Sequence, residues 1–300
     1  MSVAERGTKT QLANELGISR ASLYYHRKMP QKDEELRRQV EEVMQRNPGY
    51  GSPRVAIALG VNKKRIERIM RKFGLKPARR SSTPRKLQDE GNEPTKYENI
   101  LARLSPIAPN VVWASDFTFI SYKGEFVYLC TVLDLFTGEV LGFNISRRHD
   151  AAFVKLAIVR ALNKTGTAPA YFHSDQGSEY ASEDVSTWLE SRGVIISMNP
   201  KGSPWCNGSQ ESFFGRFKTE FGDFGRFTKY VDLLEALYEQ LHYFSNIRIK
   251  TKLKMSPAEF RRKWDKQQEF LTGFQSPPEP PSTPIRALCI RPACAALELA

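Results

Sequence analysis

Apolar, β-branched and aromatic residues dominate three consecutive runs in the middle of the chain, at about residues 111–120, 125–135 and 139–145. Short runs of this composition, bounded by turn residues, are typical of strands. Gly124 and Gly138 close the short polar connections between the runs, where a hairpin turn favours glycine. The pattern therefore predicts three strands joined by two hairpins.

After these strands the period becomes helical, and helices are predicted at residues 151–163, 183–191 and 230–246. The short strands "APAYFHS" and "GVIISM" alternate with them. A further helix opens in "SPWCNGSQESFFGRFKTE", where Phe213, Phe217 and Phe221 recur every four residues. Hairpin strands followed by alternating helices and strands predict an α/β domain over residues 109–265, with a mixed sheet and helices on its faces.

The first 80 residues carry a different, all-helical pattern that occurs twice, in residues 1–29 and 30–80. In each, a short helix meets a glycine turn, and a polar residue, Ser19 or Asn62, is placed to cap the next helix. Gly74 is expected to end the last helix, whose apolar stripe comprises Ile66, Ile69, Met70 and Phe73. The pattern is typical of helix-turn-helix units, and the alternative is two ordinary helical hairpins.

The basic charge of the chain is concentrated in this helical head. The whole chain has a net charge of +12, and residues 1–80 hold 19 Lys and Arg against 8 Asp and Glu, whereas residues 81–300 hold 26 against 25. Such asymmetry indicates a nucleic-acid-binding head on a nearly neutral body. The candidates for DNA contacts are Arg20, Lys63, Lys64, Arg65, Arg68, Arg71 and Lys72.

Other segments limit the remaining possibilities. Residues 81–108 are polar and contain proline, which predicts a linker, and the proline-rich residues 266–300 predict a mostly disordered tail. The chain has no apolar run of transmembrane length, and the N-terminal segment has no apolar core of a signal peptide. Four cysteines without zinc-finger spacing indicate a reduced, cytoplasmic protein.

Three carboxylates are informative when their positions are considered together. Asp116 lies in the middle of an apolar strand, where burial is costly unless the carboxylate is paired or binds a cation. Asp175 ends a short strand in "HSDQGSEY", and Glu211 begins a helix. Taken singly, Asp175 reads as a turn residue and Glu211 as a solvated one, but 58 residues separate Asp116 from Asp175 and 35 separate Asp175 from Glu211.

This spacing resembles the DDE triad of the retroviral-integrase-like transposases of bacterial insertion sequences. The closing segment "YFSNIRIKTKLKMSPAEF" is similar to the end of that family's core, and such transposases commonly carry helix-turn-helix units before it. The resemblance implies an RNase H-like fold, with Asp116, Asp175 and Glu211 as catalytic residues and metal ligands. It also implies that Lys218, two turns after Glu211, meets a DNA phosphate.

The implied reaction is the cutting and joining of DNA strands. Two Mg²⁺ ions about 3.5–4 Å apart, or Mn²⁺ in their place, would stabilise the attacking and leaving oxygens. Asp116 would bridge both ions, while Asp175 and Glu211 would each hold one. The expected partners are the terminal inverted repeats of the element, target DNA and further copies of the chain. We expect a bacterial, nucleoid-associated protein without a membrane partner.

Several positions depart from the family pattern or compete with the triad. Cys206-Asn207-Gly208 stands where many relatives have Asp-Asn-Ala, and the second motif carries Gln176 and the additional carboxylate Glu179. Asp134, on the neighbouring strand, is the main rival as a metal ligand, and His173 lies two residues before Asp175. A DNA-binding regulator with an inactive core and a hydrolytic nuclease of the same fold remain the alternatives to a transposase.

Overall fold

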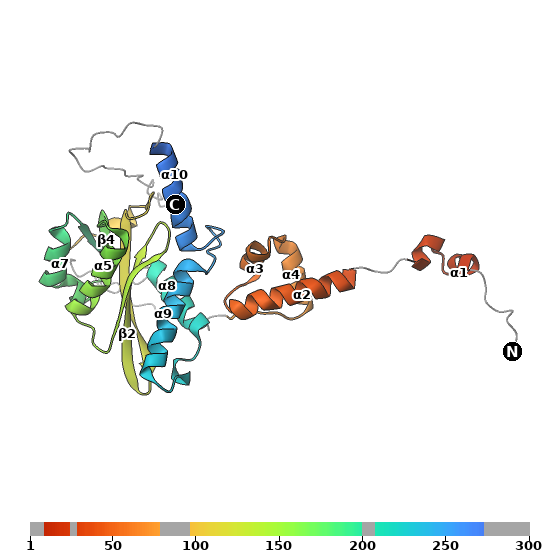
Figure 1. The fold of residues 1–300 in the computed structure, drawn as a ribbon, viewed down its shortest axis with the longest axis horizontal. Coiled ribbons are helices and arrows are strands. Elements are labelled where there is room, and N and C mark those ends of the chain that lie inside the picture. The colour runs from red at the N-terminus through yellow and green to blue at the C-terminus, as the bar shows by residue number, and fades with distance from the viewer. Residues whose placement is uncertain (1–8, 25–28, 79–96, 200–207, 273–300) are drawn as a thin grey trace, which may run out of the picture. The chain divides into compact units, whose positions relative to one another are not determined.

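The computed structural model of the chain describes residues 9–24, 29–78, 97–199 and 208–272 (Figure 1). Its contacts divide the chain into two units, Met1–Arg46 with Tyr50–Lys76, and Asn47–Gly49 with Pro77–Ala300. None of the described helices is both long and apolar enough to cross a membrane.

The first unit contains three packed helices, α2 (Met29–Arg46), α3 (Ser52–Leu59) and α4 (Lys63–Lys72). Their shared core is apolar and comprises Leu36, Val40, Val55, Ile66 and Ile69. Between α3 and α4, Gly60 has a φ of 63°, a value that favours glycine, and the Asn62 side chain accepts a hydrogen bond from the Lys64 N–H at 2.9 Å. The predicted turn and the Asn62 cap are therefore confirmed.

The first predicted helix-turn-helix unit is less regular than expected. Its first helix, α1, covers Lys9–Glu15, and Gly17 turns the chain with a φ of 62°. Ser19 accepts a hydrogen bond from the Ser22 N–H at 3.3 Å, as a cap should, but the following element is a 3-10 helix, η1 (Arg20–Tyr24). The expected second helix is therefore only a short, tight one within the described residues.

The second unit is built on a five-stranded mixed sheet, in the order β3-β2-β1-β4-β5. The strands of the predicted hairpins are β1 (Val112–Tyr122), β2 (Glu125–Asp134) and β3 (Val140–Ser146), and β2 is antiparallel to both β1 and β3. The short strands β4 (Tyr171–Ser174) and β5 (Ile195–Met198) extend the sheet in parallel from β1. The α/β class with a mixed sheet is confirmed.

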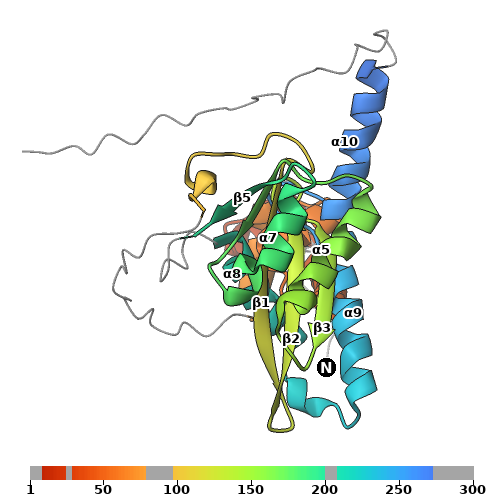
Figure 2. The same cartoon turned by 90° about the vertical axis from the view of Figure 1, so that its left-hand side faces the viewer.

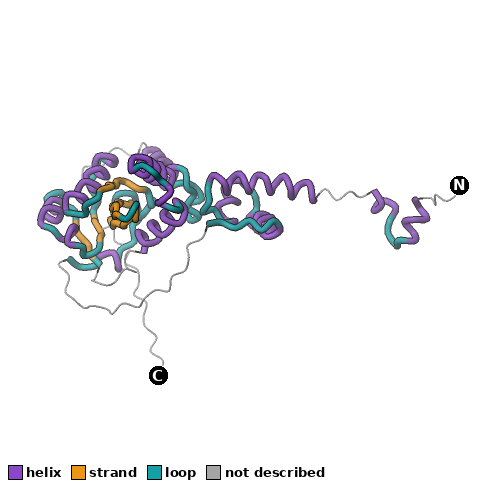
Figure 3. Tube along the Cα trace, turned by 90° about the horizontal axis from the view of Figure 1, so that it is seen from below, coloured by secondary structure: helices purple, strands orange, loops and turns teal. Residues whose placement is uncertain are grey.

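Helices cover both faces of this sheet, as the edge-on view in Figure 1 and the view from below in Figure 3 show. One face packs against α5 (Ala151–Thr165), α6 (Ser178–Ala181) and α7 (Glu183–Glu190), which face the viewer in Figure 2. The other packs against α8 (Gly208–Phe221), the 3-10 turn η4 (Phe224–Arg226) and α9 (Tyr230–Asn246). The phenylalanine stripe of α8 is buried here, and this burial fixes the helix beside β1.

Two helices lie partly or wholly in segments that were predicted to be a linker and a disordered tail. Within the expected linker, the 3-10 helix η2 (Ile100–Ala102) reaches the edge strand, because the Ile100 N–H donates to Ser197 Oγ at 3.0 Å. Within the expected tail, α10 (Pro257–Thr272) continues past residue 266. Its aromatic residues Phe260 and Trp264 pack against Phe136 of the β2–β3 turn, which anchors the start of this helix.

Candidate catalytic carboxylates

Asp116 lies on β1, and Asp175 directly follows the neighbouring parallel strand β4. Ala114 of β1 pairs with His173 of β4 at the end of their ladder, so each aspartate comes two residues after this last pair. β4 ends at Ser174, so Asp175 is the first residue of the loop that follows the strand.

Backbone N–H groups hold both aspartates. Asp116 Oδ1 accepts from the Phe117 N–H at 2.7 Å, and Asp175 Oδ1 accepts from the Gly177 N–H at 3.1 Å. A Cβ atom on Gly177 would lie 3.2 Å from Asp175 Oδ1 and 2.9 Å from Glu179 Oε2, so this close approach favours glycine. Within the described residues, the second oxygen of each aspartate accepts no hydrogen bond, which leaves it available to a ligand.

Gln210 fastens the first turn of α8 to the sheet. Its buried Nε2 donates to the carbonyl oxygens of Ala114 at 2.7 Å and Thr131 at 3.3 Å, and its Oε1 accepts from Thr131 Oγ1 at 3.1 Å. Thr131 is the residue opposite Asp116 on β2. The next residue of α8 is Glu211, so Gln210 fixes the position from which Glu211 projects. The sequence analysis missed Gln210, because a glutamine beside a glutamate in a helix gives no signal of its own.

The three carboxylates lie close enough to affect one another electrostatically. Burial raises the pKa of Asp116 to about 7, and the negative charges of Asp175 and Glu211 add to this effect. Burial also raises the pKa of Asp175, against the opposing hydrogen bond from Gly177. Like charges gathered in a partly desolvated site favour a bound cation. Even so, no group of three His, Cys, Asp or Glu side chains within the described residues is arranged to hold a metal ion.

The raised pKa of Asp116 predicts a pH-dependent stability. A carboxyl whose pKa is about 7 in the folded chain and 3.8 as a free group stabilises the fold when protonated, and this contribution is lost as the pH rises through about 7. Asp116→Asn, which stays neutral, should therefore stabilise the metal-free protein at pH 8 by on the order of 2–4 kcal/mol, or roughly 3–10 °C in Tm. At pH 4 the gain should vanish.

Thermal unfolding in the presence of a chelator would measure this effect, with the exposed Asp232→Asn as the matched control. The control should change Tm little at either pH, because surface substitutions are usually within about 0.5 kcal/mol. Equal Tm values for Asp116→Asn and the unchanged protein at pH 8 would contradict the buried, anionic setting of Asp116.

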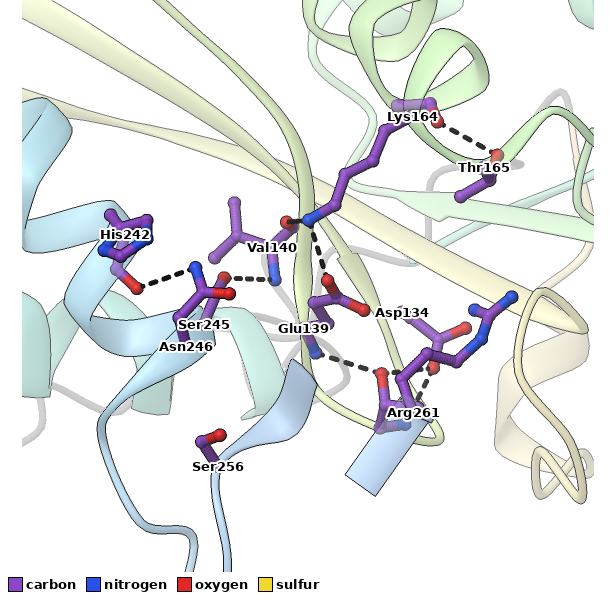
Figure 4. Close-up of polar contacts among 12 residues, drawn as sticks. Asp134, Glu139, Val140, Lys164, Thr165, His242, Ser245, Asn246, Ser256 and Arg261 are labelled. Carbon is purple, nitrogen blue, oxygen red and sulfur yellow. Dashed lines mark hydrogen bonds and ion pairs between the residues drawn. The ribbon is translucent and has the colours of Figure 1, made fainter. Parts of the chain in front are cut away.

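Asp134, the rival ligand, has a structural role at the β2–β3 turn (Figure 4). Its Oδ1 accepts from the N–H and Oγ1 of Thr137, at 2.7 and 2.9 Å, and its Oδ2 accepts from the Asn110 N–H at 2.7 Å. Asp134 is fully buried, and these three bonds occupy both carboxylate oxygens. It is therefore a turn-capping residue.

Glu179 and His173 are also held by partners. His149 Nδ1 lies 2.7 Å from Glu179 Oε1, and His173 Nδ1 lies 3.0 Å from Ser197 Oγ. Burial lowers the pKa of His173 to about 4, so its imidazole is neutral at physiological pH. Of the small residues before Glu211, Cys206 and Asn207 lie outside the described residues.

The basic residues predicted to contact DNA fall into two groups. Arg68 and Lys72 of α4 bind the buried Asp33 of α2, with Arg68 Nη1 and Lys72 Nζ each 2.9 Å from Asp33 Oδ2. The hydrogen bonds from these two cations lower the pKa of Asp33 to about 2. Arg68 and Lys72 therefore lock α4 onto α2, which limits their freedom to reach DNA.

The other basic candidates are not bound to Asp33, and all of them except the half-buried Lys218 are exposed. In the described part of the chain, the side chains of Arg20, Lys64, Arg65 and Arg71 have no ion-pair partner, whereas Lys63 lies 3.3 Å from Glu67. Lys218 Nζ donates to the Phe119 carbonyl at 2.8 Å and lies over that ring. The Lys218 amine therefore contacts β1 at Phe119.

Comparison with known proteins identifies recognised domains in both units. Residues 106–204 and 211–264 match two family models described as integrase core domains, and residues 30–82 match an HTH-like domain. The sheet topology and these matches agree with the RNase H-like fold.

The curated relatives match most of the chain. The putative transposase InsK for insertion sequence element IS150 of Escherichia coli K12 is 31% identical over 256 residues, or 81% of this chain and 90% of the relative. An uncharacterized transposase-like protein of Haemophilus influenzae is 32% identical over 67% of this chain and 93% of its own length. Among solved structures, the HTLV-2 integrase catalytic core domain in complex with magnesium is 19% identical, with a TM-score of 0.44 over 52% of this chain and 99% of that one.

Proposed function

The chain belongs to the insertion-sequence transposases with an integrase core domain, and on that premise we propose that it cuts DNA at the ends of its own element and joins them to target DNA. The observation that carries the proposal is the electrostatic proximity of Asp116, Asp175 and Glu211, which come from β1, the end of β4 and the start of α8. A nucleic-acid-binding regulator has no use for three such carboxylates in one place.

The carboxylates fit divalent cations by their chemistry. Their donor atoms are hard oxygens, which suit Mg²⁺ and Mn²⁺, and Asp116 and Asp175 each have one oxygen free of hydrogen bonds from the described residues. In this proposal Asp116, Asp175 and Glu211 hold two ions. Bound ions of this kind activate an attacking oxygen and stabilise a leaving one.

The residues around the carboxylates hold them in position. The N–H groups of Phe117 and Gly177 fix one oxygen of each aspartate, and Gln210 fixes the helix turn that carries Glu211. Gln176, next to Asp175, has a buried Nε2 without an acceptor in the described residues, so it can donate to a bound phosphate oxygen. The site thus offers both metal ligands and a substrate donor.

The head supplies recognition of the DNA ends. The turn between α3 and α4 and the exposed basic face of α4 suit the major groove, and the residues of the first helical turn are those that meet bases. Arg65 lies in this first turn, and its planar guanidinium can donate to guanine O6 and N7 together. Arg71 lies near the end of the helix, where the proposal places the DNA backbone. Because an element has two ends, we also propose that the chain acts as a homo-oligomer on DNA.

Arg65→Ala should cost about 1–3 kcal/mol on the element end and relax the preference at one base pair. Arg71→Ala, its matched control on the same helix, should weaken binding to every sequence alike and lower the salt slope by about one unit. Titrations on the element end and on scrambled DNA would measure both. If Arg65→Ala lowers the two affinities by the same factor, α4 is a phosphate clamp and does not read sequence.

A strand-transfer assay with pre-cut element ends, target DNA and Mg²⁺ or Mn²⁺ tests the proposed function. Joined products support a transposase. Cleavage without joining would indicate a nuclease, and binding without either reaction would indicate a regulator with an inactive core.

A further inference from the structure

A cavity of about 280 Å³ opens on the face of α8 that turns away from Glu211. Ser209, Ser212 and Arg216 line it from α8, at spacings of three and four residues that place them on one side of the helix. Glu211 does not line it. The cavity is therefore separate from the candidate catalytic carboxylates, although the same helix serves both.

Three cations converge on this cavity, namely Arg216, Arg248 and Lys250. The guanidinium of Arg248 is neutralised by the buried Glu220, with Nε 2.8 Å from Oε2. By contrast, within the described residues neither the Arg216 guanidinium nor the Lys250 amine has a hydrogen-bond or ion-pair partner. The one carboxylate in the lining, Asp134, already accepts three hydrogen bonds at its turn.

The backbone is shaped to hold the Lys250 amine in this position. Lys250 N donates to the Met255 carbonyl at 3.0 Å, which fixes the start of the loop after α9. The amine then lies against Gly138 of the β2–β3 turn, where a Cβ atom would come within 1.4 Å of Nζ. Gly138 has a φ of 69°, so both its conformation and the space above it favour glycine.

Lys250 is half-buried and Arg216 is exposed, so a cation without a close partner costs more stability at Lys250 than at Arg216. Burial lowers the pKa of Lys250 to about 8, and the charges of Arg216 and Arg248 act in the same direction, against the charge of Asp134. Burial and Arg248 also lower the pKa of Arg216, against the charge of Glu220. An anion placed between Arg216 and Lys250 would offset this cost, because buried charges are stable when they are paired and hydrogen-bonded.

We infer that this cavity binds a phosphate group. Lys250 and Arg216 supply the opposite charge, Ser209 and Ser212 supply hydroxyl donors, and the first turn of α8 adds N–H groups that have no partner within the helix. Phe213 and Phe244 are among the apolar residues that line the cavity. The phosphate comes either from the DNA backbone or from a free anion in solution.

Chemical labelling of lysines on the full chain tests the inference without using strand transfer. A phosphate beside Lys250 should raise the pKa of its amine by at least about one unit. At pH 8 the reactive neutral fraction then falls from about one half to about one tenth, so acetylation of Lys250 should slow about fivefold. Mass spectrometry would measure the rate with no addition, with inorganic phosphate, and with a DNA duplex.

Lys252, exposed in the same loop, is the internal control and should keep its rate in inorganic phosphate. Protection of Lys250 by phosphate and by DNA supports a site for the DNA backbone, and protection by phosphate alone supports a free-anion site. In both cases Arg216→Met should abolish the effect. Protection by neither ligand, or DNA protection that Arg216→Met leaves unchanged, would overturn the inference.

A binding measurement on the Lys250→Met protein gives an independent test. If DNA supplies the phosphate, Lys250→Met should lower the slope of log affinity against log salt by about one unit, while Lys252→Met leaves it unchanged. Equal slopes for both variants, together with protection of Lys250 by inorganic phosphate in the unchanged chain, would place the DNA outside the cavity and leave a free anion as the ligand.

Discussion

Replacing Glu211 by Gln, or Asp116 by Asn, is expected to reduce strand transfer by at least about 10³-fold while DNA binding stays within about twofold. Each substitution keeps the size of the side chain and removes one anionic metal ligand. Metal-stabilised charge contributes several kcal/mol to phosphoryl transfer, and each 1.36 kcal/mol is a factor of ten in rate. The binding surfaces of the head lie in the other unit and are unaffected.

Strand transfer with pre-cut ends and a gel-shift titration would measure the two effects on the same preparation. Glu179→Gln is the matched control, because this carboxylate lies close to Asp175 but is paired with His149. It should retain activity within about tenfold. A Glu211→Gln protein that joins ends at a rate comparable to the unchanged chain would remove Glu211 from the catalytic set.

Gln210→Met is expected to reduce strand transfer by roughly 10- to 100-fold and to raise the Mg²⁺ concentration needed for half-maximal activity by about tenfold. Methionine fills the same volume but makes none of the hydrogen bonds to Ala114 and Thr131. Loss of outer partners that orient metal ligands typically costs 10- to 100-fold in metal affinity or activity. The effect therefore acts through Glu211, and Gln210 is a positioning residue.

Activity should be titrated with Mg²⁺ for Gln210→Met and for Thr131→Val. The second variant removes the hydroxyl bond to Gln210 Oε1 but leaves the amide bonded to Ala114, so an intermediate Mg²⁺ requirement is expected. Thermal unfolding measures the accompanying loss of stability, about 1–3 kcal/mol for unsatisfied buried groups. If stability falls but the Mg²⁺ dependence is unchanged, Gln210 supports only the fold.

Local sequence patterns predicted the elements that depend on short-range signals. The apolar, β-branched runs and the turns between them predicted the hairpin strands, and Asn62 after Gly60 predicted the start of α4. Both features depend on residues only a few positions apart. The 3-10 form of η1 was missed, because a cap such as Ser19 favours a helical turn without fixing how far it continues.

Long-range pairings could not be predicted in this way. Asp33 binds Arg68 and Lys72 from positions 35 and 39 residues away, so two residues that are predicted to contact DNA also link the helices. Asp134 likewise appeared as a possible metal ligand until its bonds to Thr137 and Asn110 were visible. Such partners are set by tertiary packing, which leaves no periodic trace in the sequence.

The same holds for the surroundings of the carboxylates. The spacing of Asp116, Asp175 and Glu211 was readable as a resemblance, and in the structure the two aspartates each follow the last β1–β4 pair by two residues. The role of Gln210 in fixing the first turn of α8 is evident only from its hydrogen bonds to two strands far away in the sequence. A buried side chain of this kind is recognised by its hydrogen bonds and not by its residue type.

The central claim is that Asp116 is a metal ligand in DNA strand transfer, and Asp116→Cys tests it most directly. A thiolate is a poor ligand for Mg²⁺, which prefers oxygen, whereas Mn²⁺ accepts softer ligands more readily. Strand transfer should therefore be lost with Mg²⁺ and regained with Mn²⁺, while Asp116→Ser, which has no thiolate, stays inactive with both. Activity of Asp116→Cys that is the same with either ion, or absent with Mn²⁺ in a folded protein that binds DNA, would contradict this role for Asp116.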